Sequence, residues 1–435
     1  MIVQRDFYLD KLISRKNNGL VKIVTGIRRC GKSFLLMELF RGHLIEEGVP
    51  EHHIISIALD ETENKELRDA RKLHEAIVSG IGDDEDYYVL IDEAQMAITD
   101  EERKNPDAYI ALYGVLNSLL HRNNVDVYIT GSNSKFLSED IRTEFRGRGD
   151  EIHIAPFSFR EYLQSVDSDK TDKHEAFAEY LMFGGMPGLL QKNTPEDKIQ
   201  YLKGLFDETY FKDIIERHKI ERPDVLSELT DCLCSSVGSI TNINKLKDSI
   251  NSIKKSKKGN SVSYETLSSY MKYLKDCFLF SEVKRYDIRG KQYFASLNKY
   301  YCADHGLRNA RLNMRQIEET HLMENVIYNH LVNLGYSVDV GIIERKERGP
   351  EGKLQNTTYE IDFVVNRGMY QYYIQSAFSV ENEEKRNAEL KPFSIVNNSF
   401  RKIVVTRYGM RPWFDDDGIF HVSIIDFLLR DDILV

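Results

Sequence analysis

The chain has 435 residues, of which 41% are hydrophobic and 29% charged, and its formal net charge at pH 7 is −10. That length predicts two or three domains with cores of their own, and the negative charge argues against a surface that coats nucleic acid uniformly. No apolar run approaches the roughly 20 residues that span a bilayer, and the first residues lack the apolar stretch of a signal peptide. We therefore expect a cytoplasmic protein with no membrane partner.

The first 155 residues alternate between apolar runs and helical patterns. A helix is expected before residue 20, and polar helical stretches follow most of the apolar runs. Four runs have the length and β-branched content of buried strands: Val21–Thr25, His53–Leu59, Tyr87–Ile91 and Val125–Thr130. The alternation predicts an α/β fold for residues 1–155, with a parallel, doubly wound sheet and helices on both faces.

A glycine-rich motif follows the first of these strands. Four residues separate Gly26 from Gly31-Lys32-Ser33, and the helical run SFLLMELF begins at Ser33. This spacing is typical of a P-loop, in which backbone N–H groups surround phosphate, the lysine reaches the β- and γ-phosphates and the serine hydroxyl coordinates Mg²⁺. The predicted nucleotide-binding residues form one segment: Gly26, Ile27, Arg28, Arg29, Cys30, Gly31, Lys32, Ser33 and Phe34.

Two acids, Asp92 and Glu93, follow the apolar run Tyr87–Ile91. Acids at the carboxyl edge of a parallel strand lie where ligands of α/β sheets bind, beside the P-loop. We therefore expect Asp92 to hold Mg²⁺, directly or through water, and Glu93 to polarise the attacking water. The alternative is that both acids only cap the next helix. Together with the P-loop they predict hydrolysis of a nucleoside triphosphate.

Two further groups are candidates for the same reaction. In the turn Gly131–Ser134, Ser132 or Asn133 would sense the terminal phosphate or orient water, unless the turn is only a polar helix cap. Arg148, with Arg146 as the less favoured choice, would act as an arginine finger on the nucleotide of a neighbouring subunit, which requires a homo-oligomer. The alternative is a solvated loop arginine.

Residues 156–222 are predicted to form a helical lid region, and residues 223–311 have the pattern helix, turn, helix and hairpin. One of these helices is expected at Ser263–Phe278, with Ser263 as its N-cap. The hairpin is expected from Leu279–Arg285 and Gln292–Leu297. The order of these elements is typical of a winged helix.

Positive charge gathers in the same region. Between Lys245 and Lys291 there are twelve Lys/Arg and five Asp/Glu, a local balance of +7. DNA contact through residues 245–291 is one interpretation, and docking to a protein partner or packing between domains is the other.

The last segment, residues 312–435, combines a helix that contains Glu324 with several strands. Glu360 and Asp362 alternate with apolar residues along one strand, so both acids face the same side. Together with Glu324 they are a candidate metal cluster for nuclease chemistry. The next strand carries Gln375 where an acid would be expected and Ala377 where a lysine would be expected, so cleavage is not expected.

These motifs resemble a widespread prokaryotic family of AAA-type ATP-binding proteins, which couple an N-terminal AAA-like domain to a C-terminal domain of unknown function. The double arginine Arg28-Arg29 is a hallmark of that family. The matching segments cover nearly the whole chain: TGIRRCGKS at 25–33, VLIDEAQ at 89–95, ITGSNS at 129–134, GR at 147–148, PFSFREYL at 156–163, GGMP at 184–187, KYYCADHGLRNA at 299–310 and EIDFVV at 360–365.

The resemblance implies ATP as the nucleotide, with Mg²⁺. It assigns each candidate a place in a family motif: Walker A for Lys32 and Ser33, Walker B for Asp92 and Glu93, the sensor-1 position for Ser132 and Asn133, and the Gly-Arg motif for Arg148. It also makes residues 1–155 an AAA-like P-loop ATPase core, and residues 312–435 a degenerate domain similar to the PD-(D/E)xK nuclease fold.

The leading hypothesis is an ATPase that uses nucleotide turnover to switch or remodel a DNA or protein partner. The alternative is a nucleotide-gated module that binds DNA or protein through residues 223–311 with negligible hydrolysis. A third hypothesis, an ATP-dependent nuclease, is disfavoured by Gln375 and Ala377.

Overall fold

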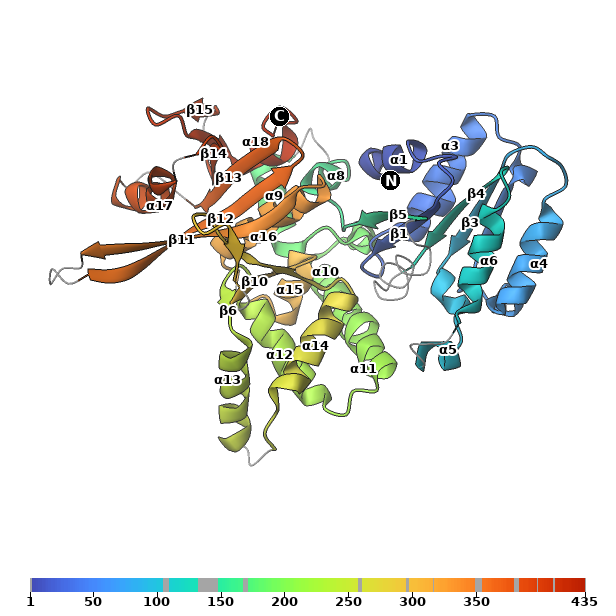
Figure 1. Cartoon of the computed structure of the whole chain (residues 1–435), viewed down its shortest axis with the longest axis horizontal. Coiled ribbons are helices and arrows are strands. Elements are labelled where there is room, and N and C mark those ends of the chain that lie inside the picture. Colours follow the sequence, from blue (N-terminus) through green and yellow to red (C-terminus); the bar gives the residue numbers. More distant parts are fainter. Residues whose placement is uncertain are drawn as a thin grey trace. The chain divides into compact units, whose positions relative to one another are not determined.

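The computed structural model describes residues 2–104, 109–131, 148–166, 171–256, 260–294, 297–315, 317–348, 354–378, 383–396, 398–409 and 411–434. The chain divides into two compact units (Figure 1). Unit 1 comprises Met1–Pro156 with Asp276–Phe278, and unit 2 comprises Phe157–Lys275 with Leu279–Val435.

Unit 1 is built on a five-stranded sheet in the order β2-β3-β4-β1-β5, in which all neighbours are parallel. Its strands are β1 (Val21–Gly26), β2 (Ile54–Ala58), β3 (Tyr87–Asp92), β4 (Val125–Thr130) and β5 (Gly149–Ile154). The four predicted strands and the parallel α/β fold are therefore confirmed. The fifth strand was not predicted, because it lies at the edge of the sheet and begins with the polar run Gly-Asp-Glu.

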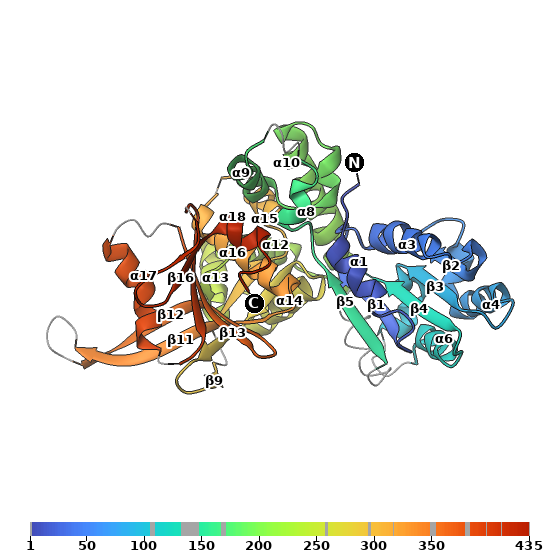
Figure 2. The ribbon, with the colours of Figure 1, turned by 90° about the horizontal axis from the view of Figure 1, so that it is seen from above.

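Helices cover both faces of this sheet (Figures 1 and 2). One face carries α1 (Asp6–Ile13) and a continuous helix made of α2 (Lys32–Phe34), the π-helical η1 (Leu35–Phe40) and α3 (Arg41–Glu46). The other face carries α4 (Ala70–Gly80) and α6 (Ala111–Leu120). The shorter helices are η2 (Glu51–His53), η3 (Lys65–Arg68), η4 (Ala94–Ala97) and α5 (Asp100–Lys104).

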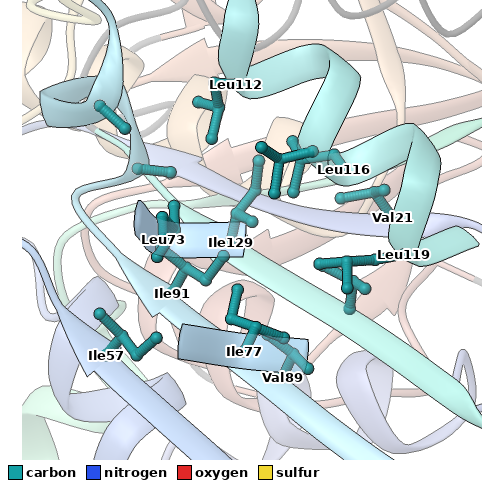
Figure 3. Packing of buried hydrophobic residues seen from close by; sticks show 14 of the residues in the cluster. Val21, Ile57, Leu73, Ile77, Val89, Ile91, Leu112, Leu116, Leu119 and Ile129 are labelled. Carbon is teal, nitrogen blue, oxygen red and sulfur yellow. The ribbon is translucent and has the colours of Figure 1, made fainter. Parts of the chain in front are cut away.

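The core of unit 1 explains this arrangement. Leu73 and Ile77 of α4 pack with Leu116 of α6 against buried strand residues such as Val89 and Ile129 (Figure 3). Every residue of β1, β3 and β4 is buried, and these strands are mostly apolar, which is typical of a parallel sheet.

Unit 2 contains two sheets. The larger has eight strands in the order β15-β16-β14-β13-β12-β11-β8-β9, and the smaller has the order β6-β10-β7. The strands are β6 (Ile240–Thr241), β7 (Phe280–Val283), β8 (Arg285–Asp287), β9 (Gln292–Tyr293), β10 (Asn298–Cys302), β11 (Ser337–Arg348), β12 (Leu354–Arg367), β13 (Tyr370–Ala377), β14 (Arg401–Thr406), β15 (Trp413–Phe414) and β16 (Phe420–Ser423).

The helices from residue 157 onward are α8 (Phe159–Leu163), α9 (Lys173–Phe183), η6 (Pro187–Gln191), α10 (Pro195–Gly204), η7 (Leu205–Phe211), α11 (Lys212–His218), α12 (Pro223–Ser235), α13 (Ile243–Ser256), α14 (Tyr264–Asp276), α15 (His305–Arg311), α16 (Glu319–Asn333), α17 (Glu383–Ile395) and α18 (Ile424–Leu429). The hydroxyl of Ser263 accepts the N–H of Thr266 at 3.1 Å, which confirms the N-cap predicted for α14. No helix in the described ranges is both long and apolar enough to cross a bilayer.

The predicted hairpin forms only in part. β8 and β9 pair antiparallel across residues 288–291, as expected. The preceding strand β7 instead pairs with β10, which lies beyond the predicted second arm. The chain changes sheets at Lys284, whose carbonyl accepts the N–H of Val340 at 2.9 Å, and β8 then joins β11. Segments of residues 223–311 and 312–435 therefore lie in one sheet.

Candidate nucleotide-binding site

The P-loop begins where β1 ends, and its shape depends on two glycines. Gly26 has φ +146°, and a Cβ there would lie 2.2 Å from the carbonyl oxygen of Ile154 at the end of β5. Gly31 has φ +99° and directly precedes the helix that begins at Lys32. Side chains are disfavoured at such positive φ values. The loop therefore turns tightly and leads directly into the N-terminus of the helix. A glycine-rich loop followed by a helix N-terminus is an arrangement that favours binding of an anion.

Lys32 is buried beneath this loop. Its Nζ lies 3.0 Å from the carbonyl oxygen of Gly26 and 3.0 Å from that of Ile27. The ammonium is thus held within the span of the loop. The next two side chains, Ser33 and Phe34, are exposed, so the hydroxyl of Ser33 is accessible to a ligand.

Arg5, which precedes α1, fixes the loop from behind and was not predicted as a site residue. Its side chain is 1% exposed. One guanidinium nitrogen donates to the carbonyl of Cys30 at 2.8 Å, and another donates to the carbonyl of Ala155 at 2.8 Å. Arg5 therefore ties the P-loop to the end of β5. A single arginine in a terminal segment gives no periodic or motif signal, so sequence reasoning passed over it.

The two acids lie at the end of β3, and a threonine connects them. Asp92 is buried, and its carboxylate accepts a hydrogen bond from the hydroxyl of Thr130, the last residue of β4. The same hydroxyl accepts the backbone N–H of Glu93 at 3.0 Å. Glu93 has φ +51°, and its half-buried carboxylate accepts a hydrogen bond from the side-chain amide of Gln95. Thr130 was also missed, although its position at a strand end was the available signal.

The sheet order brings the acids and the P-loop together at the carboxyl ends of the parallel strands, which we call the carboxyl edge of the sheet. β4 lies between β1 and β3, and the N–H of Gly131 donates to the carbonyl of Val24 at 3.1 Å. Because neighbouring strands lie about 4.8 Å apart, the ends of β1 and β3 are separated by roughly 10 Å. A gap of that size suits a terminal phosphate and its metal ion.

The sensor residues cannot be placed in the same way. Ser132 and Asn133 lie outside the described residues, as does Arg146. Gly131, the described residue of that turn, lies at the edge of the sheet between the P-loop strand and the acidic strand.

Arg148 lies at the opposite side of the sheet, where the amino ends of the parallel strands meet. It is exposed, and its carbonyl accepts the N–H of Val21, the first residue of β1. Gly149 pairs with Val21 and Ile154 with Gly26, so Arg148 is roughly 20 Å along the strand from the P-loop. This position excludes an action of Arg148 on the nucleotide of its own chain.

The donor set at this edge fits Mg²⁺ bound together with phosphates. The available oxygens are the Ser33 hydroxyl and the Asp92 carboxylate. Mg²⁺ in phosphate sites is held by one or two protein ligands, with phosphate oxygens and water completing its octahedron. Across the described part of the chain, no group of three or more His, Cys, Asp or Glu residues is arranged to hold a metal by itself.

Comparisons with known proteins assign domains to two parts of the chain. Residues 18–163 match the family model described as an AAA domain, and residues 174–318 match a domain of unknown function, DUF8612. An uncharacterized protein of Haemophilus influenzae is 30% identical over 434 residues, covering 99% of both chains. An uncharacterized protein of Methanocaldococcus jannaschii is 24% identical, covering 90% of this chain and 81% of its own.

Among solved structures, the Aeropyrum pernix ORC1 protein in complex with DNA is 12% identical with a TM-score of 0.34, covering 72% of this chain and 93% of its own. The PCH-2 protein of C. elegans is 15% identical with a TM-score of 0.25, covering 45% of this chain and 53% of its own. The extent of the Haemophilus match and the AAA domain with its P-loop together place the chain: it belongs to a family of AAA-type ATP-binding proteins in which an AAA domain precedes a domain of unknown function.

Proposed function

We propose that this protein is a Mg²⁺-dependent ATPase that uses nucleotide turnover to switch or remodel a DNA or protein partner. The observation that carries the proposal is the shared edge of the unit 1 sheet. The P-loop, the buried Asp92 and the Glu93 carboxylate are all positioned there, and Thr130 connects the two acids. An AAA domain over residues 18–163 supports nucleotide binding in general.

Lys32, Ser33 and Asp92 bind and orient in this mechanism. Lys32 gives up its contacts with the carbonyls of Gly26 and Ile27 for contacts with the β- and γ-phosphates, which exchanges dipoles for full negative charges. Mg²⁺, when bound, neutralises charge on the phosphates. Ser33 and Asp92 would hold that ion, and the hydroxyl of Thr130 fixes the orientation of the Asp92 carboxylate.

Glu93 activates water. Its backbone is held by the bond from its N–H to Thr130, and its carboxylate is held by the amide of Gln95. A carboxylate held at this edge can accept the proton of an attacking water, and its remaining lone pairs are available for this purpose. Glu93→Gln keeps the shape of the side chain and removes the base.

Arg148 is proposed to act between subunits. Its exposed position at the far edge of the sheet supports a role on the nucleotide of a second copy, whereas a role on its own nucleotide conflicts with the strand geometry. A finger of this kind contributes about 10³–10⁵ to the rate where it operates. The proposal therefore includes a homo-oligomer as the active form.

The second candidate function is a nucleotide-gated binding module with negligible hydrolysis. The helices α12, α13 and α14 together with the sheet β6-β10-β7 support it, because this order of elements is typical of a winged helix. Part of the basic charge expected to face DNA is compensated within the fold. Lys254 pairs with Asp224 and Glu228, and Lys275 pairs with Glu282. These pairs reduce the positive charge that the surface offers to DNA and favour a protein partner for this candidate.

The test is phosphate release from ATP by the parent protein and by Lys32→Ala, with and without duplex DNA. The proposal predicts Mg²⁺-dependent release by the parent and none above background by Lys32→Ala. Nucleotide binding is measured on the same samples. Tight ATP binding without turnover under either condition would contradict the ATPase proposal and favour the nucleotide-gated binding module. The next step would then be a search for its protein partner.

A further inference from the structure

Three carboxylates of unit 2 converge on one lysine. Glu324 comes from α16, and Glu360 and Asp362 come from the same face of β12, as their alternation predicted. The Nζ of Lys299, on β10, lies 2.8 Å from Oε1 of Glu324, 2.7 Å from Oε1 of Glu360 and 3.5 Å from Oδ1 of Asp362. Lys299 is 3% exposed, so its ammonium is enclosed by the acids.

Neighbouring groups fix the acids in place. The hydroxyl of Tyr301, two residues after Lys299 on β10, donates to Oε1 of Glu324 at 2.6 Å. The backbone N–H of Ser376 donates to Oδ2 of Asp362 at 2.9 Å. Glu324 and Asp362 thus keep their orientation toward the ammonium through bonds to separate strands.

The strand β13 closes the cluster without adding charge to it. The side-chain oxygen of Gln375 accepts the N–H of Asp362 at 3.3 Å, and its amide donates to Glu389 of α17 at 3.0 Å. Both polar ends of the Gln375 side chain are therefore engaged. Ala377, two residues along the same strand, contributes no amine.

Three carboxylates around one point are otherwise the donor set of a hard divalent cation such as Mg²⁺ or Mn²⁺. Such an ion binds oxygen at about 2.0–2.1 Å in the case of Mg²⁺. The Nζ distances to Glu324 and Glu360 are instead those of charge-assisted hydrogen bonds from an ammonium, and the 3.5 Å to Asp362 is that of a looser ion pair. The ammonium and a metal ion would compete for the same space and the same oxygens.

We propose that the Lys299 ammonium is a built-in cation that occupies a divalent-cation position, so that unit 2 neither binds a metal at these acids nor cleaves nucleic acid through them. The lysine comes from the small sheet, whereas the acids come from α16 and the large sheet. Lys299 therefore also joins these two parts of unit 2. The proposal is independent of ATP hydrolysis, because none of these residues belongs to the AAA domain.

The pKa directions agree with an excess of negative charge around one ammonium. Burial raises the pKa of Asp362 and of Glu324, while Lys299 acts against this rise for both. The three acids raise the pKa of Lys299 beyond the lowering caused by burial. Without the ammonium, the acids would need another cation or additional protons.

The experiment measures Mn²⁺ binding by the full chain without nucleotide, from the loss of the free-ion signal in electron paramagnetic resonance. Lys299→Met removes the charge and keeps most of the stem. We expect it to bind one Mn²⁺ at least tenfold more tightly than the parent, and we expect Lys299→Met/Asp362→Asn to lose this gain. Lys254→Met is the matched control, since it removes a buried ammonium that pairs with Asp224 and Glu228, away from these three acids.

Two results would overturn the proposal. One is a folded Lys299→Met protein that binds no more Mn²⁺ than the parent. The other is a parent protein that binds Mn²⁺ tenfold more tightly than Asp362→Asn does, or that cleaves plasmid DNA when Asp362→Asn does not. If Lys299→Met does not fold, Lys299→Gln replaces it. If neither folds, the parent compared with Asp362→Asn decides, because equal Mn²⁺ binding and intact DNA support the proposal and a difference contradicts it.

Discussion

The hydroxyl of Thr130 donates a hydrogen bond to the carboxylate of Asp92, and so joins the ends of two adjacent strands at the proposed catalytic edge. Thr130 is buried and also receives the N–H of Glu93 at 3.0 Å. One hydroxyl therefore positions the residue proposed to hold Mg²⁺ and the residue proposed to activate water.

Thr130→Val should slow ATP turnover about 10–100-fold, because a hydrogen bond to a charged group contributes about 1.5–3 kcal/mol. Valine keeps the shape of threonine and removes the hydroxyl. Thr130→Ser is the matched control and should retain most of the activity. Steady-state phosphate release by the three proteins is the measurement, and equal rates for Thr130→Val and the parent would remove Thr130 from the mechanism.

Arg5→Ala should weaken both the fold and nucleotide binding. Loss of the buried guanidinium removes its bonds to the carbonyls of Cys30 and Ala155, so the free energy of unfolding should fall by on the order of 2 kcal/mol. The loosened P-loop should raise the Kd for ATP roughly tenfold, a step of about 1.4 kcal/mol. Urea denaturation and ATP titration measure the two effects.

Arg41→Ala is the control for this prediction, since Arg41 is a half-buried arginine of unit 1 whose ion pair with the exposed Glu51 spans 3.6 Å. Exposed pairs of this kind contribute little. If Arg5→Ala and Arg41→Ala have the same free energy of unfolding and the same Kd for ATP, Arg5 is not a positioning residue of the loop.

The Asp362 carboxyl should make the stability of the protein depend on pH. Burial, followed by the charge of Glu324, raises its pKa from 3.8 to about 7. A group whose folded pKa is raised stabilises the fold in its protonated form, so this contribution is complete below about pH 4 and is lost as pH rises through about 7. Relative to Asp362→Asn, the parent should lose stability as pH rises from 5 to 7, by up to about 1.4 kcal/mol per pH unit.

Urea unfolding of both proteins at intervals between pH 5 and pH 8 measures this difference. Parallel curves over that range would show that Asp362 ionises in the folded protein as it does in the unfolded chain. Lys299→Met should be less stable than the parent at every pH in this range. Its loss of stability with rising pH should continue above pH 7, because the lysine charge that lowers the pKa of Asp362 is gone.

Arg148→Ala and Glu93→Gln should complement each other. Arg148→Ala keeps its own phosphate loop and acids, and Glu93→Gln keeps an intact Arg148. If the arginine acts between subunits, a mixture of the two inactive proteins should regain a measurable part of the parent ATPase rate. Arg148→Ala alone should be about 10³-fold slower than the parent. If the mixture is no more active than its components at concentrations where subunits associate, Arg148 does not act as an arginine finger between subunits.

The sequence predicted the strands of the unit 1 sheet that lead to the P-loop and the two acids, because their signals are local. The strand Val21–Thr25, the glycine spacing and the helix after Lys32 follow from neighbouring residues, and β3 and β4 are continuously buried. β5 escaped prediction because an edge strand that starts with polar residues has neither pattern. The assignments of roles to Lys32, Asp92 and Glu93 remain predictions until activity is measured.

The contacts that sequence reasoning missed are those between distant residues. Arg5 meets Cys30 across 25 positions, and Lys299 meets Asp362 across 63. No spacing rule relates such partners, because their proximity depends on strand order. The acidic group of Glu324, Glu360 and Asp362 was recognised from side-chain alternation, but the lysine inside it comes from another sheet. The hairpin failed for a similar reason, since β7 and β8 pair in different sheets.

The most direct test is a comparison of the parent with Glu93→Gln, with ATP binding and phosphate release measured on the same preparations, with and without duplex DNA. The account predicts equal ATP affinity for the two proteins and turnover by the parent alone, since glutamine keeps the shape of the side chain but accepts no proton. Turnover by Glu93→Gln at the parent rate would contradict the account, because the proposed base would then play no part in hydrolysis.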